Sequence, residues 1–268
     1  MTAWRSLAAE LALWRSAERS ATFWCRDDDA SRDSLPLERL LDVAGRLALP
    51  IALAAIPAAL DETLVKVVQQ SRFTVVIQHG YAHRNHAPPP ERKMELGVHR
   101  DLGETLAELA RGADVLARSF GSRFMAVLVP PWNRIADPIV ARLPDAGFCG
   151  LSTLGPRKAR CPVTGLTQCN THVDVIAWRS GRAFIGVDAA VERVVAHLRS
   201  RREGGADSDE PTGVLTHHLD MDAAAWEFLV ELVARTREGG AVWVDALEAF
   251  GGGSAASAYL RPISMKRT

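Results

Sequence analysis

Short apolar stretches alternate with amphipathic helical stretches along most of the chain, and this alternation restricts the fold more than any other feature. The clearest apolar stretches are residues 21–25, 50–56, 73–77 and 124–129. Between them, residues 35–49 and 100–119 space their apolar side chains as helices do. This order predicts parallel strands with helices packed around them. Because 268 residues match the usual length of a (β/α) barrel, we expect an α/β fold, a distorted TIM-like barrel of seven or eight strands.

The composition is that of an ordinary folded domain, with 47% hydrophobic and 24% charged residues. No internal repeat or linker divides residues 1–250, so we expect them to form a single barrel domain. The sequence GGGSAAS begins at residue 251, and we expect residues 251–268 to be a flexible C-terminal tail.

The charge balance limits the partners that the chain would attract. The 32 lysines and arginines equal the 32 aspartates and glutamates, so no overall field draws the protein to nucleic acid, and we expect no nucleic-acid partner. Residues 4–16 look helical, but Arg5, Glu10 and Arg15 interrupt the apolar core that a signal peptide needs. No window is long and apolar enough for a membrane span. We therefore expect a cytoplasmic protein.

Polar residues gather where the apolar stretches end. The acidic run 27–29 follows residues 21–25, and His79 follows residues 73–77. In a (β/α) barrel the carboxyl ends of all strands meet at one mouth, where active sites lie. We therefore expect the acidic run and the segment after His79 to face the same mouth.

A metal site is the chemistry that best accounts for these two segments. His79 and His83 stand in the sequence H-G-Y-A-H, and a helical turn over residues 80–83 would place both rings on one side. Two imidazoles and one carboxylate are a usual set for catalytic zinc. Three adjacent carboxylates repel one another unless they are solvated, hydrogen-bonded or bound to a cation. Each segment alone also fits a plain surface role, a solvated helix or an acidic capping turn, but their shared placement at strand ends favours the metal.

Four short motifs resemble, in order, the successive motifs of the polysaccharide deacetylase family. They are C-R-D-D-D, H-G-Y-A-H, V-P-P-W-N and L-T-H-H, and the likeness spans about Thr22 to His218. Members of that family remove acyl groups from amino sugars. The resemblance implies that Asp27 is the general base. It also implies that the metal ligands are Asp28, His79 and His83.

The last motif would supply the general acid. By resemblance this is His217, or His218 if the register differs by one, and Asp174 is the best candidate for a residue that tunes the acid. Of the remaining histidines, His172 precedes a strand and could line the pocket. His197 lies in a polar helical context, where we expect it to be solvated.

The third motif would form a wall of the site. Pro131 and Trp132 match it, with a backbone N–H as the oxyanion donor, and we place Arg134 and Tyr81 with them as substrate-binding candidates. Tyr81 and Trp132 could stack on a sugar ring. Val129 stands where the family has the arginine that orients the base, so that salt link would have to come from Arg26 or Arg134, or be absent.

These expectations together describe a metal-dependent hydrolase that removes an N-acetyl or other acyl group from an amino sugar. Water activated by one divalent metal would attack, an aspartate would act as base and a histidine as acid. Zn²⁺ is the first choice of metal, with Co²⁺, Ni²⁺ or Fe²⁺ also compatible with the ligands. Two alternatives remain open: the substrate is a small non-sugar amide, or the protein binds a metal or saccharide without catalysis.

Overall fold

The computed structural model describes residues 2–179 and 181–251, and its centre is a curved parallel sheet. The strands of this sheet follow the order β6-β5-β4-β3-β2-β1-β10-β7, with β11 paired to β1. Within the described residues the sheet has nine strands, which confirms the expected α/β barrel-like fold. The strands are β1 (Thr22–Ala30), β2 (Ile51–Ala55), β3 (Thr74–His79), β4 (Phe124–Val129), β5 (Gly150–Leu151), β6 (Thr167–Gln168), β7 (Val173–Asp174), β10 (Thr212–Thr216) and β11 (Val242–Trp243).

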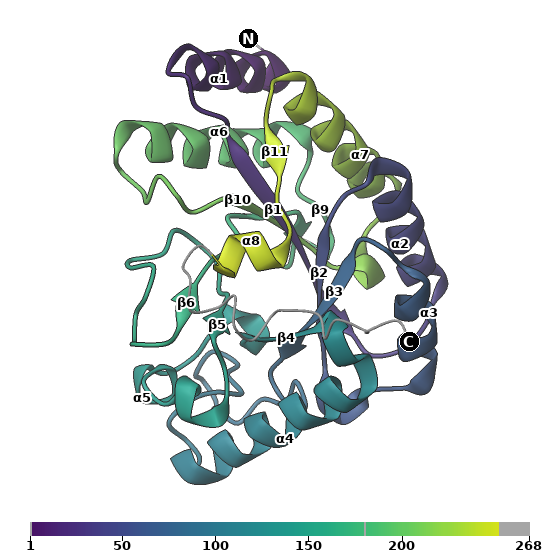
Figure 1. The fold of residues 1–268 in the computed structure, drawn as a ribbon, viewed down its shortest axis with the longest axis vertical. Helices are drawn as coiled ribbons and strands as arrows, with labels where there is room; N and C mark the ends of the chain where they lie inside the picture. Colours follow the sequence, from purple (N-terminus) through teal and green to yellow (C-terminus); the bar gives the residue numbers. More distant parts are fainter. Residues whose placement is uncertain (1, 180, 252–268) are drawn as a thin grey trace, which may run out of the picture.

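Helices surround the sheet, as the alternating pattern predicts (Figure 1). The α-helices are α1 (Ala3–Ser16), α2 (Leu35–Leu47), α3 (Glu62–Gln70), α4 (Leu102–Phe120), α5 (Asp137–Val140), α6 (Val187–Glu203), α7 (Ala223–Glu238) and α8 (Ala246–Gly251). The 3₁₀ turns are η1 (Pro57–Ala59), η2 (Gly121–Arg123), η3 (Pro131–Asn133), η4 (Leu143–Ala146) and η5 (His218–Asp220). A separate antiparallel pair, β8 (Ile176–Ala177) and β9 (Ala183–Phe184), lies in the connection between β7 and α6.

Strand β1 has two differently packed faces, and this division decides the position of every side chain near its end. Phe23 and Cys25 belong to the large core between the sheet and the outer helices. Trp24 belongs to a second apolar cluster that fills the barrel interior with residues of β2, β3 and β4. Because successive side chains of a strand point to opposite faces, Arg26 continues the interior face.

Helix α8 closes one end of the barrel interior. Phe250 packs edge-on against Trp24 with ring centroids 5.6 Å apart, and Ala246 and Ala249 join the same cluster. The part of the interior that α8 covers is therefore apolar. The predicted tail after Gly251 lies outside the described residues. In the part of the chain that the structure describes, no helix combines the length and apolar character that crossing a membrane requires.

Candidate active site

Asp27 points away from the barrel interior. It lies on the face of β1 that Cys25 turns toward the helices, and its carboxylate is fully buried. The Thr216 hydroxyl donates to it at 2.7 Å, the backbone N–H of His218 donates at 3.0 Å, and the His218 Nδ1 lies 2.5 Å away. Burial lowers the pKa of His218, but the Asp27 carboxylate outweighs burial and raises that pKa above its ordinary value. The Asp27 carboxylate is thus fully engaged in linking β1 to the end of β10.

Asp28 faces the barrel interior beside Arg26, two positions earlier on the same face. Arg26 holds both carboxylate oxygens, with Nε to Oδ1 at 2.9 Å and Nη2 to Oδ2 at 3.0 Å. The guanidinium also donates to Ser152 and Asn133, each at 2.7 Å, and both partners of the ion pair are buried. Arg26 therefore makes a salt link of the kind that Val129 cannot make.

Asp29 is turned toward the histidines by an irregularity in β1. The pairing of β1 with β2 shifts register between Asp27 and Ala30, and Asp29 has a left-handed φ of 74°. Such bulges redirect side chains at strand ends. The Asp29 Oδ1 lies 3.2 Å from Nε2 of His79 and 3.3 Å from Nε2 of His83. These three residues form a group whose donor atoms all lie within 4.8 Å of one another, so the structure brings Asp29, and not the predicted Asp28, to the histidines.

The two imidazoles both turn Nε2 toward the Asp29 carboxylate. The Nδ1 of His79 lies 3.1 Å from the carbonyl oxygen of Val129, to which it donates, so loss of the Nε2 proton would leave a lone pair there for a metal, as in metal-bound histidines. Burial opposes the charged form of His79, but Asp28 and Asp29 raise its pKa. Burial and the charge of His79 lower the pKa of His83. Burial alone would raise the pKa of Asp29, but the hydrogen bond from His79 brings that pKa below its ordinary value.

The segment between the histidines is a loop and not the helical turn that the spacing allowed. Glu95, which the sequence did not single out, organises it. Its buried carboxylate accepts the backbone N–H groups of Tyr81 at 3.1 Å, Ala82 at 2.8 Å and Arg84 at 3.3 Å. A Cβ at Gly80 would lie 1.9 Å from the same carboxylate, so only glycine fits there. Glu95 thereby fixes the loop that carries His83.

We expect Glu95→Ala to lower zinc affinity by about 10- to 100-fold, the usual effect of losing an outer partner of a metal ligand. The three N–H groups would lose their acceptor, and the loop would no longer hold His83 against Asp29. Glu95→Gln keeps one oxygen acceptor and should show a smaller loss. A competition titration with a chromophoric chelator measures both. Glu91→Ala, in the same loop but paired with His99 at 3.0 Å, is the matched control, and equal affinities for all variants would contradict the assignment.

His217 lies at the end of β10, beside the predicted tuning residue. Its Nδ1 is 3.9 Å from Oδ1 of Asp174, and its ring meets the Trp178 ring edge-on at 4.6 Å. Trp178 donates to the other Asp174 oxygen at 2.7 Å, and burial raises the pKa of Asp174. The charge of His217 also acts on the pKa of Asp29, so the two share one site. His218 is directed instead to Asp27.

The third-motif residues take different positions. Pro131 packs over Gly80, where an added Cβ would lie 2.6 Å from its ring. The Trp132 ring lies 4.6 Å from the His83 ring, at the mouth. The Tyr81 ring instead lies against the guanidinium of Arg111 on α4, at 5.6 Å. Trp132 is therefore the aromatic side chain of this group that stands beside the histidines.

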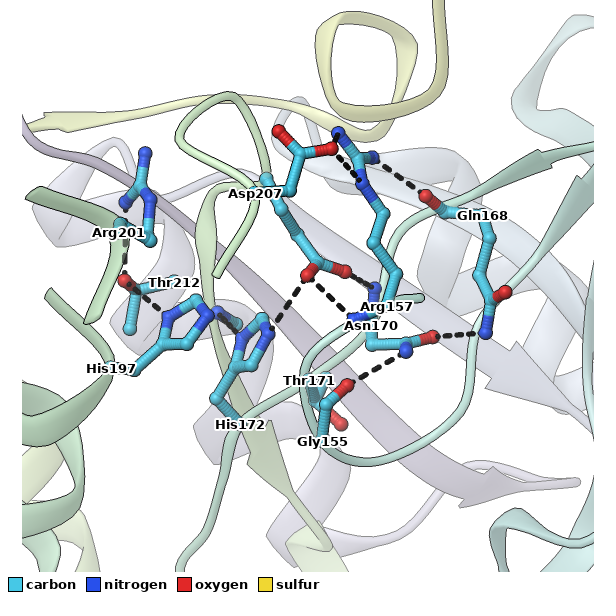
Figure 2. A network of polar contacts seen from close by, with 12 residues as sticks. Gly155, Arg157, Gln168, Asn170, Thr171, His172, His197, Arg201, Asp207 and Thr212 are labelled. Carbon is cyan, nitrogen blue, oxygen red and sulfur yellow. Dashed lines mark hydrogen bonds and ion pairs between the residues drawn. The ribbon is translucent and has the colours of Figure 1, made fainter. Parts of the chain in front are cut away.

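A second group of potential ligands lies elsewhere in the barrel wall (Figure 2). It joins His172, His197 and Glu210, and His197 is buried there, so the expected solvation of His197 is wrong. The two rings are stacked, with centroids 3.4 Å apart and planes 17° from parallel. A metal must lie close to the plane of each ring that binds it, and two rings stacked 3.4 Å apart and tilted by only 17° have planes that meet too far away for one ion to bind both. Moreover, the N–H of Gly213 donates to His172 Nδ1 at 2.9 Å, which places the His172 proton on Nε2, toward Glu210.

This group is a structural network that requires neutral imidazoles. Glu210 accepts the backbone N–H groups of Arg157 and Asn170, each at 2.9 Å, and so ties the connection after β5 to the start of β10. Burial lowers the pKa of His172, and burial together with His172 and Arg201 lowers the pKa of His197 to about 2.

Acid should weaken the fold through this pair. Because the pKa of His197 in the folded state lies below the ordinary 6.5, the stability that the neutral ring contributes is fully present above about pH 6.5 and is lost as the pH falls. At pH 5 the cost is about 2 kcal/mol for His197. Between neutral pH and pH 5, the free energy of unfolding measured with urea should fall by about 2 kcal/mol less in His197→Gln than in wild type. His99→Gln, on the surface loop, should lose as much as wild type, and an unchanged pH response in His197→Gln would refute the assignment.

Comparison with known proteins places this geometry in a known architecture. No family model matches the sequence, and no curated protein sequence matches it significantly. Solved structures do match. A putative polysaccharide deacetylase from Mycobacterium smegmatis has 16% identity and a TM-score of 0.63, covering 93% of this chain and 95% of its own. The Bc1960 peptidoglycan N-acetylglucosamine deacetylase has 14% identity and a TM-score of 0.56, covering 90% and 96%.

A third structure, a CE4 family pseudoenzyme from Bacillus anthracis, has 14% identity and a TM-score of 0.59 and covers 86% of this chain and 66% of its own. At such identities the likeness establishes the architecture alone. The chain has the polysaccharide deacetylase fold, as its four sequence motifs predict.

Proposed function

We propose that the protein is a metal-dependent deacetylase that hydrolyses the N-acyl group of an amino sugar. The observation that carries the proposal is the convergence of Asp29, His79 and His83 at the ends of β1 and β3. Asp28 and His217, a base and an acid for proton transfer, lie next to this group. The architecture shared with known deacetylases supports the same conclusion.

The donor set fits one divalent cation, with two imidazoles and one carboxylate and coordination positions left for water and substrate. When bound, such an ion would act as a Lewis acid on the acyl carbonyl and make the attacking water more acidic. Zinc is the first choice, and cobalt, nickel or iron suit the same ligands. The hydrogen bond of His79 to Val129 already holds that imidazole in the tautomer that ligation needs.

Asp28 is the group that we assign as general base. It faces the site from the interior side of β1, and Arg26 holds its carboxylate in one orientation through two contacts. A fixed carboxylate within reach of the attacking water can accept its proton. Asp27, the base implied by the sequence motif, has its oxygens engaged by Thr216 and His218 on the opposite face.

His217 is the group that we assign as general acid. Oδ1 of Asp174 lies 3.9 Å from its Nδ1, and Trp178 restricts the ring from one side. A protonated imidazole at this position can donate to the departing amine, which is a poor leaving group without it. The backbone at Trp132 is the candidate oxyanion donor, since its ring already lies against His83 at the mouth.

Acetate release from N-acetylglucosamine oligomers, measured on protein of known metal content, tests this proposal. We expect release with added Zn²⁺ and none after chelation. A library of small amides run in parallel tests for a non-sugar substrate. A metal-loaded protein that hydrolyses no member of either set would contradict the enzymatic proposal and favour a non-catalytic binding role; one matched structure is itself described as a pseudoenzyme.

A further inference from the structure

Positive side chains gather at the mouth of the candidate site. Arg134 follows β4, is partly buried and donates from Nη1 to the carbonyl oxygen of Lys93 at 2.6 Å. Arg92, next to Lys93, and Arg179, in the connection after β8, lie close enough for their charges, with burial, to lower the pKa of Arg134. We call Arg92, Lys93, Arg134 and Arg179 the cationic rim. It draws on three segments that are far apart in the sequence.

Within the described residues, no member of the cationic rim forms an ion pair with a carboxylate. Glu91, the nearest acid in the sequence, pairs with His99 at 3.0 Å. The whole chain carries 32 positive and 32 negative residues, so the rim is a local imbalance and not part of a general excess. Like charges held together cost stability, and a bound anion would relieve that cost.

The cationic rim lies beside the reacting groups. The Lys93 Nζ lies 5.9 Å from the centre of the Trp132 ring, and that ring lies 4.6 Å from the ring of His83. Arg179 follows directly after Trp178, whose ring meets the His217 ring at 4.6 Å. A substrate that binds beside His83 would therefore lie within reach of the rim.

We infer that the substrate carries an anionic group, a carboxylate or a phosphate, that binds Arg134 together with its neighbours in the cationic rim. This inference rests on the proposed function and narrows its substrate class. Guanidinium groups bind both kinds of oxyanion through paired hydrogen bonds, which gives them an advantage over a neutral hydroxyl at the same place. Lys93 and Arg92 add charge without needing a fixed geometry.

Binding and turnover of three probes test the inference. On zinc-loaded protein, N-acetylglucosamine 6-phosphate and N-acetylmuramic acid carry a phosphate and a carboxylate, and N-acetylglucosamine is their neutral counterpart. We expect at least one charged probe to bind about 10-fold or more tightly than the neutral one, since hydrogen bonds to charged groups are the strong ones. The probe that binds better identifies the kind of anion, and added salt should weaken its binding alone.

Arg134→Gln should remove that preference, lowering affinity and kcat/KM for the charged probe about 10-fold more than for the neutral probe. Arg118→Gln, exposed on the last turn of α4, is the matched control and should change neither. Equal binding of all three probes, including no binding of any, would overturn the inference, as would a preference that survives in Arg134→Gln. Hydrolysis of the neutral probe without any preference would leave the proposed deacetylase standing, whereas preferential binding without hydrolysis would overturn only the proposed function.

Discussion

Asp28→Asn is expected to lower kcat by about 10²- to 10⁴-fold, the usual contribution of a general base, while zinc affinity changes little. The amide has the shape of the carboxylate but cannot take a proton from water. Asp28→Asn also breaks a buried ion pair, which costs about 3–5 kcal/mol of stability, although Arg26 keeps its contacts with Ser152 and Asn133, so kcat is taken per folded molecule. Acetate release per zinc-loaded molecule, with metal content measured on the same sample, gives the result.

Asp27→Asn is the matched comparison, because it makes the same change one residue earlier. The Asp27 carboxylate pairs with His218 in a fully buried position, and breaking a buried pair of this kind costs about 3–5 kcal/mol. We expect that loss in urea unfolding, with kcat per folded molecule retained. Loss of turnover in Asp27→Asn with unchanged stability, together with an active Asp28→Asn, would restore the assignment implied by the sequence motif.

The roles proposed from the geometry differ by one position from those that the motif implies, and the reason is physical. Sequence predicted that three acids end a buried strand, but a one-residue shift exchanges the two faces of a strand completely. The bulge between Asp27 and Ala30 also changes the direction of the side chain that follows Asp28, and the hydrophobic pattern of the sequence does not predict a bulge. One signal was present: a buried Arg26 on the interior face needs an acid on that same face, and two residues later stands Asp28. The same period of two leaves Asp27 on the helix side.

Other parts of the site lay beyond sequence reasoning because they depend on contacts across the fold. Glu95 acts on a loop 11 to 14 residues away and carries no pattern of its own. The choice between His217 and His218, open in the sequence, depends on which ring faces Asp174 and which faces Asp27. The strands of the barrel were predictable where apolar runs are long. The short strands β5 and β7 also lie within apolar runs of the sequence, but β6 has two residues and no such run, and side-chain contacts such as those of Glu210 hold the chain there.

Asp29→Asn is expected to lower zinc affinity by at least about 100-fold, and turnover with it, since an amide oxygen without charge is a weak ligand for this ion. Asparagine is the informative replacement because Asp29 has a φ of 74°, and asparagine tolerates left-handed backbone better than most residues. The bulge should therefore keep its shape, so that loss of metal reports the lost carboxylate. Chelator competition measures the affinity, and unfolding in the presence of a chelator checks the fold of the metal-free protein.

The pair of variants at adjacent positions separates the two possible registers of the acidic run. If Asp29 is the ligand and Asp28 the base, Asp28→Asn retains zinc without turnover, and Asp29→Asn loses both. The register implied by the sequence motif predicts instead that Asp28→Asn loses zinc and that Asp29→Asn retains it. The distances favour the first outcome, because Oδ1 of Asp29 lies 3.2 Å and 3.3 Å from the two histidine Nε2 atoms. Both oxygens of Asp28, by contrast, are already held by Arg26, so Asp28 would have to leave a buried ion pair before it could bind a metal.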